Sequence, residues 1–299
     1  MGRLQVRVSG VTVTFSGLLA NFLYGITIGS AYTLIAAGFS IIFGMVGVLN
    51  FAHGGLVMLG AYLGFTILVL TGNFWLSLVL APAGIALLGG IVERLLIRRL
   101  YGKDIHLTLF LTFGLSMVFS NAVLLIWGGT SYSIELPSYF KGFIDLLGVY
   151  YPKFRLFVLL FSCLLVGFLW IFFSRSRWGS VIRAGMFDIE TVQAFGIDIY
   201  NVFSLLFIAC SGLAAVAGVF VGAMRSLNPV MDLDFMTVAL SVVVIGGMGS
   251  FKGALIGSLM LGFAEAFGAQ IMPGLAKFST WAIMVAVILV RPKGLFPER

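Results

Sequence analysis

A long apolar stretch, residues 25–64, constrains this chain more than any other feature. About 20 apolar residues form a helix that crosses the ~30 Å hydrocarbon core of a bilayer, so this stretch is long enough to cross more than once. Only 10% of the 299 residues are charged, whereas soluble domains carry about 25%. Because a soluble fold of this length would still need a polar surface, the bilayer must be the solvent for most of the chain.

The apolar blocks are continuous and do not alternate with polar residues, which favours helices over the strands of an outer-membrane barrel. They predict an all-α integral membrane protein, a polytopic bundle of about 8–9 transmembrane helices with broken or re-entrant helices, in one domain over residues 1–299. The blocks cover residues 18–43, 49–70, 74–97, 107–127, 156–173, 202–222, 235–245, 254–267 and 278–290.

Lys and Arg gather at block ends, in residues 94–103, 175–183 and 291–299. The positive-inside rule places these clusters in the cytoplasm, and the polar segment 128–155 then forms an external loop. The net charge of +7 therefore indicates membrane topology, and we expect no nucleic-acid partner. Nine full passes would place Arg3 and Arg7 outside, against this rule. A re-entrant element in the first seventy residues would remove the conflict.

The interior of the 25–64 stretch has one strongly polar feature, NFAHGG at residues 50–55. Asn50 and His53 are three apart and would share one helix face. Gly54 and the following glycine would allow another backbone to approach closely, or would let the helix break. Because polar groups in hydrocarbon usually face a protein interior or a water path, we expect a functional interruption here. Substrate contact and a packing hydrogen bond are both open for His53.

A second interruption follows the short apolar block 235–245, at Gly246, Gly247 and Gly249. Short, glycine-interrupted segments indicate discontinuous helices at a transport site. Glu265 is the one carboxylate well inside an apolar block. An intramembrane acid is a functional candidate, although a helix-end carboxylate that reaches the external interface fits equally well.

Residues 175–200 change from solidly apolar to amphipathic. Val181 and Ile182 lie on the apolar side of the expected helix, and Arg183 lies off it. Asp188 stands in a position suited to capping a helix. The pattern predicts a short helix, within residues 175–198, with a side that faces a partner; a surface helix resting on the bilayer is the alternative.

The chain lacks the residues of several common chemistries. The Gly102–Lys103 pair has no glycine five positions earlier, so there is no phosphate-binding loop and we do not expect the chain to hydrolyse ATP. Two histidines and two cysteines are too few for a metal site. We therefore expect no metal site in this chain.

Four motifs stand in order along nearly the whole chain: GSAY at residues 29–32, NFAHG at 50–54, GGMGS at 246–250 and PKGL at 292–295. With these motifs the chain resembles the LivH-type permeases, the membrane subunits of branched-chain amino-acid ABC importers. The resemblance implies a multi-pass protein of the bacterial cytoplasmic (inner) membrane, a transporter subunit that is not an enzyme and has no cofactor of its own. It also implies a second, LivM-type permease, two ATP-binding cassette subunits that bind the ATP, and a periplasmic or surface substrate-binding protein.

The resemblance further implies roles for particular residues. The amphipathic segment resembles the coupling segment that receives the ATPase movement, with Gly179, Arg183, Ala184, Asp188, Ala194 and Gly196. We expect alternating access, with a pathway lined or gated by Asn50, His53, Gly54, Gly246, Gly247, Gly249 and, more weakly, Glu265. Branched-chain amino acids are the expected cargo; other amino acids, urea, short amides and sugars stay open. A proton-coupled carrier and a passive channel are the rival classes.

Overall fold

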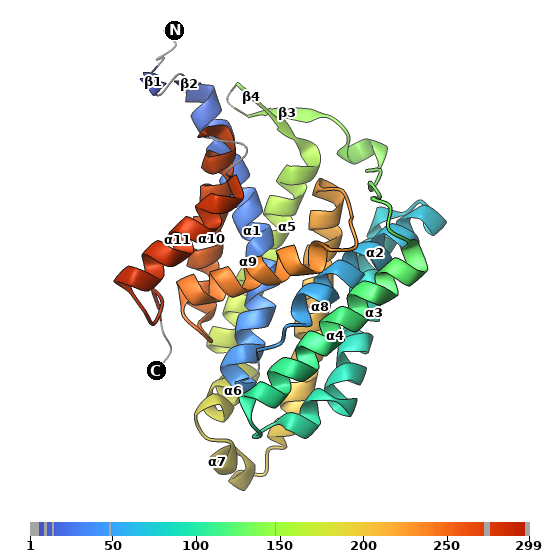
Figure 1. Ribbon diagram of the computed structural model, residues 1–299, viewed down its shortest axis with the longest axis vertical. Helices are drawn as coiled ribbons and strands as arrows, with labels where there is room; N and C mark the ends of the chain where they lie inside the picture. Colours follow the sequence, from blue (N-terminus) through green and yellow to red (C-terminus); the bar gives the residue numbers. More distant parts are fainter. Residues whose placement is uncertain are drawn as a thin grey trace.

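A computed structural model of the chain describes residues 6–8, 11–13, 15–47, 49–146, 148–271 and 276–296. Seven of its helices are long and apolar enough to cross a membrane. They pack side by side along the long axis of the molecule (Figure 1). These helices are α1 (Phe15–Val46), α2 (His53–Thr71), α3 (Phe74–Leu95), α4 (Ile105–Trp127), α5 (Lys153–Arg175), α8 (Ile199–Met224) and α10 (Phe251–Ile271). The prediction of a polytopic helical membrane protein is confirmed.

Two further apolar helices are shorter: α9 (Met231–Gly246), of 16 residues, and α11 (Ala276–Val290), of 15. A helix of 16 residues is about 24 Å long, less than the ~30 Å of the hydrocarbon core. Helix α9 lies across the bundle rather than along it (Figure 1). The sequence leaves open a re-entrant element in the first seventy residues; in the part of them that the structure describes, both α1 and α2 are long enough to cross, and the short helix is α9.

The two ends of the bundle carry different small elements (Figure 1). One end carries the start of α1 and two antiparallel hairpins, β1 (Val6–Val8) with β2 (Val11–Val13), and β3 (Phe143–Leu146) with β4 (Val149–Pro152). The opposite end carries α6 (Arg177–Phe187) and α7 (Ile189–Ala194). The positive-inside rule predicts that the α6 end lies in the cytoplasm, and we therefore call the opposite end, where α1 begins, the outer end.

Short connections between the long helices follow their local chemistry. Thr71, Gly72 and Asn73 join α2 to α3: Gly72 takes a left-handed conformation (φ +65°), and the Asn73 side chain accepts hydrogen bonds from the backbone N–H groups of Trp75 and Leu76 in the first turn of α3. This turn is as the sequence predicts. The remaining connections contain two short 3-10 helices, η1 (Ile97–Leu100) and η2 (Ser138–Phe140).

Glycines let pairs of long helices approach until their backbones touch. At the crossing of α1 and α10, a Cβ atom on Gly29 would lie 2.9 Å from the Leu259 Cα, closer than real Cβ atoms come to backbone. At the crossing of α2 and α8, a Cβ on Gly218 would lie 2.9 Å from the Ala61 backbone nitrogen. Close backbone packing of this kind replaces the hydrophobic driving force that lipid does not supply between helices.

The amphipathic segment forms two helices instead of the single helix that its pattern predicts. The backbone is extended at Asp188 (φ −153°), which ends α6 and caps α7. The Asp188 carboxylate accepts hydrogen bonds from the Thr191 hydroxyl (2.5 Å) and the Thr191 backbone N–H (3.0 Å). These bonds to the charged form hold the pKa of Asp188 below its usual value. The capping role is confirmed, and the extended cap residue is the reason why one helix becomes two.

Candidate functional site

The NFAHG motif forms the connection between α1 and α2. Asn50 precedes α2, so the expectation that Asn50 and His53 share a helix face is wrong. The Asn50 side-chain oxygen instead accepts a hydrogen bond from the Ala52 N–H (3.1 Å), and its carbonyl accepts one from the His53 N–H (3.0 Å). Asn50 therefore shapes the turn that starts α2.

His53 is fully buried at the start of α2. Its Nε2 lies 2.8 Å from the Ile35 carbonyl oxygen of α1, to which a protonated Nε2 donates. The hydrogen bond ties α2 to α1, and it realises the packing role considered for His53. Two neighbouring polar atoms, Asn50 Nδ2 and His53 Nδ1, are buried and have no hydrogen-bond partner among the described residues. Buried polar atoms are usually paired, so these two mark the junction as unusual.

Gly54 brings the start of α2 against α9. A Cβ atom on Gly54 would lie 2.9 Å from the Met236 backbone nitrogen. At its other flank, the start of α9 contacts α4: Asp232 is buried, and its carboxylate accepts hydrogen bonds from the hydroxyls of Ser120 (2.5 Å) and Ser116 (3.3 Å). Asp232 is therefore an interior acid, not part of the external turn that its neighbours Asn228 and Pro229 suggest.

The predicted interruption at the glycine run is confirmed, because α9 ends at Gly246 and α10 begins at Phe251. Gly247 (φ +104°) and Gly249 (φ +82°) take conformations that L side chains rarely adopt. Residues 295 and 296 supply hydrogen bonds to the last carbonyls of α9 at this break. Their N–H groups donate to the carbonyls of Ile245 (2.9 Å) and Gly246 (2.8 Å). The PKGL motif thus packs against the GGMGS motif, far from it in sequence.

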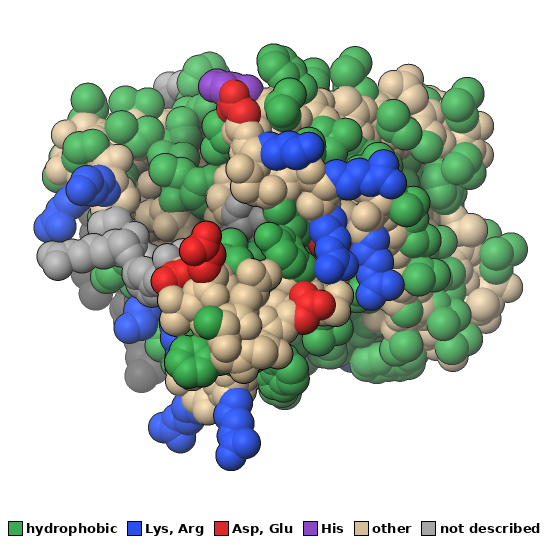
Figure 2. Space-filling model, turned by 90° about the horizontal axis from the view of Figure 1, so that it is seen from below, with side chains coloured by type: hydrophobic (Ala, Val, Ile, Leu, Met, Phe, Trp, Pro, Cys, Tyr) green, Lys and Arg blue, Asp and Glu red, His purple; other side chains and the backbone are tan. Residues whose placement is uncertain are grey.

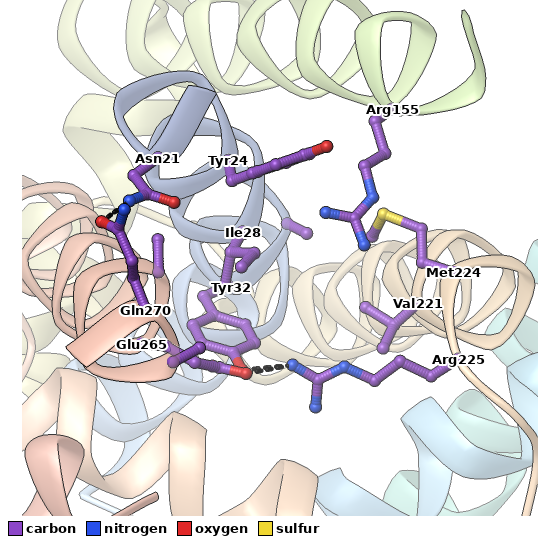
Figure 3. Close-up of a pocket in the computed structure, with 13 residues that line it drawn as sticks. Asn21, Tyr24, Ile28, Tyr32, Arg155, Val221, Met224, Arg225, Glu265 and Gln270 are labelled. Carbon is purple, nitrogen blue, oxygen red and sulfur yellow. Dashed lines mark hydrogen bonds and ion pairs between the residues drawn. The ribbon is translucent and has the colours of Figure 1, made fainter. Parts of the chain in front are cut away.

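Glu265 lies on α10, away from both junctions, at the edge of a cavity of about 510 Å³ near the outer end of the bundle (Figure 3). The Arg225 guanidinium lies 2.5 Å from the Glu265 carboxylate, and the Tyr32 hydroxyl donates to the same carboxylate. Arg225 also donates to the Tyr32 hydroxyl (3.2 Å). Glu265 is therefore a paired acid, with partners on α1 and just beyond α8 that the sequence did not indicate.

The rest of the outer cavity is bounded by one further cation and by apolar side chains. Arg155, on the first turn of α5, lies over the ring of Tyr24, with its guanidinium carbon 4.7 Å from the ring centre. Asn21 and Gln270 hydrogen-bond to each other across the α1 and α10 helices. Figure 3 shows these charged and polar groups arranged around an open space between α1, α5, α8 and α10. The cavity combines charged groups with an apolar floor.

We expect the Arg225–Glu265 pair to stabilise the outer end of the bundle by about 1 kcal/mol, because the Arg225 side chain is 46% exposed and exposed ion pairs are worth little. Arg225→Ala and Glu265→Ala each lower the thermal unfolding midpoint in detergent, and the double variant loses less than the sum of the two. Glu135→Ala, at an exposed carboxylate on the external loop, is the control. Additive effects in the double variant would show that the pair contributes no coupling.

The expected coupling residues lie at the end of the bundle opposite to this cavity. Arg183 donates to the Phe173 carbonyl at the end of α5, and it lies 3.2 Å from the Ser180 hydroxyl oxygen. Gly179 fits against the end of α5, where a Cβ atom would lie 2.9 Å from the Phe172 carbonyl oxygen. Gly196 (φ +79°) closes the turn after α7. Five of the six are exposed on this face, and only Gly179 is buried; the exposed residues are Arg183, Ala184, Asp188, Ala194 and Gly196.

Figure 2 views the molecule from this end, where Lys and Arg side chains lie around a surface of neutral and apolar groups that also carries several acidic side chains. The expected site residues therefore fall into three places. Asn50, His53 and Gly54 lie at the α1–α2 junction, the glycine run lies at the α9–α10 break, and Glu265 lies in the outer cavity. The coupling residues form a fourth group. Helix α9 connects the first two places, since it contacts Gly54 near its start and ends in the glycine run.

The model of the family "Branched-chain amino acid transport system / permease component" matches residues 21–289. The chain is 33% identical, over 291 residues, to the high-affinity branched-chain amino acid transport system permease protein BraD of Pseudomonas aeruginosa, with 93% of this chain and 95% of BraD covered. LivH of Escherichia coli, with the same description, is 31% identical over 297 residues (94% and 96% covered). The probable permease protein LivM of Methanocaldococcus jannaschii is 26% identical over 206 residues (61% and 59% covered).

No solved structure matches the chain significantly. The predicted resemblance to the LivH-type permeases is confirmed over almost the full length of chain and relatives. Members of the family are transport components, so this multi-pass membrane chain is a permease and not an enzyme. The chain belongs to the family of branched-chain amino acid transport system permease components.

Proposed function

We propose that this chain is the membrane-spanning subunit of an ABC importer that moves branched-chain amino acids across the bacterial cytoplasmic membrane. The full-length similarity to BraD and LivH carries this proposal. The partners are a LivM-type permease, two ATP-binding subunits and an external substrate-binding protein. The additional likeness to a LivM protein supports a pair of related permeases around one pathway.

The ATP-binding subunits dock on α6 and α7. Both helices lie at the basic end of the molecule (Figure 2), and a hydrogen bond from Arg183 to the Phe173 carbonyl ties α6 to the end of α5. A movement of α6 is therefore transmitted directly to α5, one of the long helices of the bundle. Ala184 and Ala194 are exposed, and their small methyl side chains let another protein approach closely, so they suit a contact surface.

Within the bundle, α9 is the moving element of the proposed alternating-access cycle. The short helix is held at its start by Gly54 and Asp232, and at its end by the glycine run and residues 295 and 296. Asn50, His53, Gly54, Gly246, Gly247 and Gly249 then act as gating elements around α9. Glu265 lines the outer cavity, where the binding protein releases its cargo.

The first experiment is affinity purification of the tagged chain in mild detergent, followed by reconstitution into liposomes. We expect a second permease and an ATP-binding subunit to co-purify, and leucine uptake to require ATP together with the binding protein. Uptake that persists without the partners and stops when the proton gradient collapses would favour a secondary carrier. Uptake that never exceeds equilibrium would favour a passive channel.

A substitution on the proposed docking face tests the assignment of α6. Ala184→Trp places a large side chain on an exposed position and leaves the hydrogen bond between the Ala184 carbonyl and the Asp188 N–H intact. We expect loss of the ATP-binding subunit from the purified complex, with the permease still monodisperse. Ser133→Trp, at an exposed position of the external loop, is the matched control and retains the subunit. Equal retention in both variants would contradict docking on α6.

A further inference from the structure

The outer cavity contains a cation that its surroundings do not neutralise. Arg225 and Glu265 form the one ion pair among the residues that the structure describes. Arg155 also lines the cavity, and within the described ranges it contacts the Tyr24 ring but pairs with no carboxylate. Two guanidinium groups and one carboxylate leave one positive charge in excess at the cavity wall. A partly buried guanidinium attracts an anion more strongly than one that is surrounded by water.

Several contacts hold Arg155 in a fixed place. The residue lies on the first turn of α5, directly after the β3–β4 hairpin. The Tyr24 ring beneath its guanidinium packs in turn on the ring of Tyr151, with 5.2 Å between ring centres. The Tyr151 hydroxyl lies 2.6 Å from the Thr27 hydroxyl of α1. The cation is therefore positioned before any ligand arrives, which lowers the entropic cost of binding.

The shape and lining of the cavity restrict the ligand. Its volume of about 510 Å³ falls within the range of ~300–1,000 Å³ that is usual for small-molecule sites. Below the charged groups, the wall is made by the apolar side chains of Ile28, Val221, Met224 and Ala266. A planar guanidinium matches a carboxylate by two parallel hydrogen bonds. The cavity thus suits a small molecule with one carboxylate and an aliphatic body.

We propose that this cavity is an entry site for a free hydrophobic amino acid, whose α-carboxylate binds Arg155 and whose aliphatic side chain packs on the apolar wall. The carboxylate of Glu265, which is paired with Arg225 and Tyr32, also lines this space and attracts the α-ammonium group (Figure 3). The inference rests on the proposed function, and it adds which chemical groups of the cargo the permease itself recognises, namely the α-carboxylate and the aliphatic side chain.

Protection of an introduced cysteine tests this site directly. Ala269 lines the cavity and is exposed, so Ala269→Cys, with Cys163→Ser and Cys210→Ser, gives one reactive thiol in the full-length chain with its co-purifying subunits in nanodiscs. The rate of labelling by a neutral thiol reagent is measured with three probes: leucine, 4-methylpentanoate and isopentylamine. At several times Kd the rate falls by roughly fivefold, following 1 + [L]/Kd.

We expect leucine and 4-methylpentanoate to protect the thiol, and isopentylamine, which lacks the carboxylate, to give no protection. Arg155→Gln removes the protection, and Arg155→Lys keeps part of it. Protection by the amine as strong as by leucine, or no protection by either carboxylate, overturns the proposal. Protection by vesicles of anionic phospholipid alone also overturns it, because the cavity would then hold a lipid headgroup. Since the three probes act on intact Arg155, the test does not depend on the folding of the Arg155 variants.

The labelling and uptake measurements together distinguish a failure of the entry site from a failure of the proposed function. ATP-driven leucine uptake without any protection of the thiol would leave the importer assignment standing and remove the entry site. Protection in a chain that shows no ATP-driven uptake would do the reverse. Size-exclusion chromatography and the labelling rate without ligand report whether each variant is folded and whether its thiol is equally accessible.

Discussion

Gly262→Val should abolish the folded permease. Gly262 lies where α10 crosses α1, and a Cβ atom there would lie 2.6 Å from the Gly29 Cα. The obstacle is backbone on a second helix, which cannot rotate away as a side chain can. Overpacking in a rigid core costs typically ~1–3 kcal/mol and more where backbones must separate, out of a total stability of ~5–15 kcal/mol. We expect the monodisperse fraction in size-exclusion chromatography to fall by roughly tenfold or more.

Gly167→Val and Gly114→Val are matched controls. Both glycines lie inside long helices, α5 and α4, and a Cβ atom on either would meet nothing within 4 Å. These two variants should therefore be produced and purified like the unmodified chain. Equal yields for all three variants would mean that α1 and α10 do not pack through Gly262.

Gly247→Val should remove most transport and leave the protein inserted and assembled. Gly247 has φ +104° at the break between α9 and α10, a conformation that costs a side-chain-bearing residue on the order of 1–3 kcal/mol. The site is also crowded, since a Cβ on Gly294 would lie 2.5 Å from the Gly247 Cα. The strain is relieved only if the break changes shape. Because each 1.4 kcal/mol is a factor of ten, we expect uptake per assembled complex to fall by roughly tenfold.

The control for this variant has the same kind of strain in another place. Gly72 has φ +65°, and a Cβ there would meet nothing within 4 Å. It lies in the turn between α2 and α3, far in sequence from the glycine run. Gly72→Val should lower the thermal unfolding midpoint but keep uptake per complex. Equal loss of uptake in both variants would show that backbone strain in general, not the α9–α10 break, limits transport.

The sequence predicts the long helices well, because a span is specified by the length of its apolar block alone. Their ends also follow local rules, as at Asn73 and Asp188, whose side chains cap the helix that follows. What the blocks do not encode is which side of each helix faces protein. Helix α1 is apolar on every side, so no periodicity indicates that Gly29 contacts α10 or that Tyr32 reaches Glu265.

The outer cavity shows this limit most clearly. Arg225 and Glu265 stand 40 positions apart, and Arg225 and Tyr32 stand 193 apart. Each residue alone fits a helix end at the membrane surface, and only the packing of α1, α8 and α10 brings them together. Asp232 shows a related limit. Its neighbours are turn residues, but α9 returns into the bundle, where two serines of α4 accommodate the carboxylate.

The backbone pairing that completes the α9–α10 break also has a consequence for biosynthesis. The carbonyls of residues 245 and 246 receive their hydrogen bonds from residues 295 and 296, which the ribosome adds only after α10 and α11. Unpaired carbonyls are costly in hydrocarbon. A nascent chain that stalls between α11 and residue 295 would thus contain every long helix. The carbonyls of residues 245 and 246 at the α9–α10 break would still lack their hydrogen-bond donors. Newly made permease should pass through this state, in which quality-control proteases find an exposed helix end that the finished molecule no longer presents.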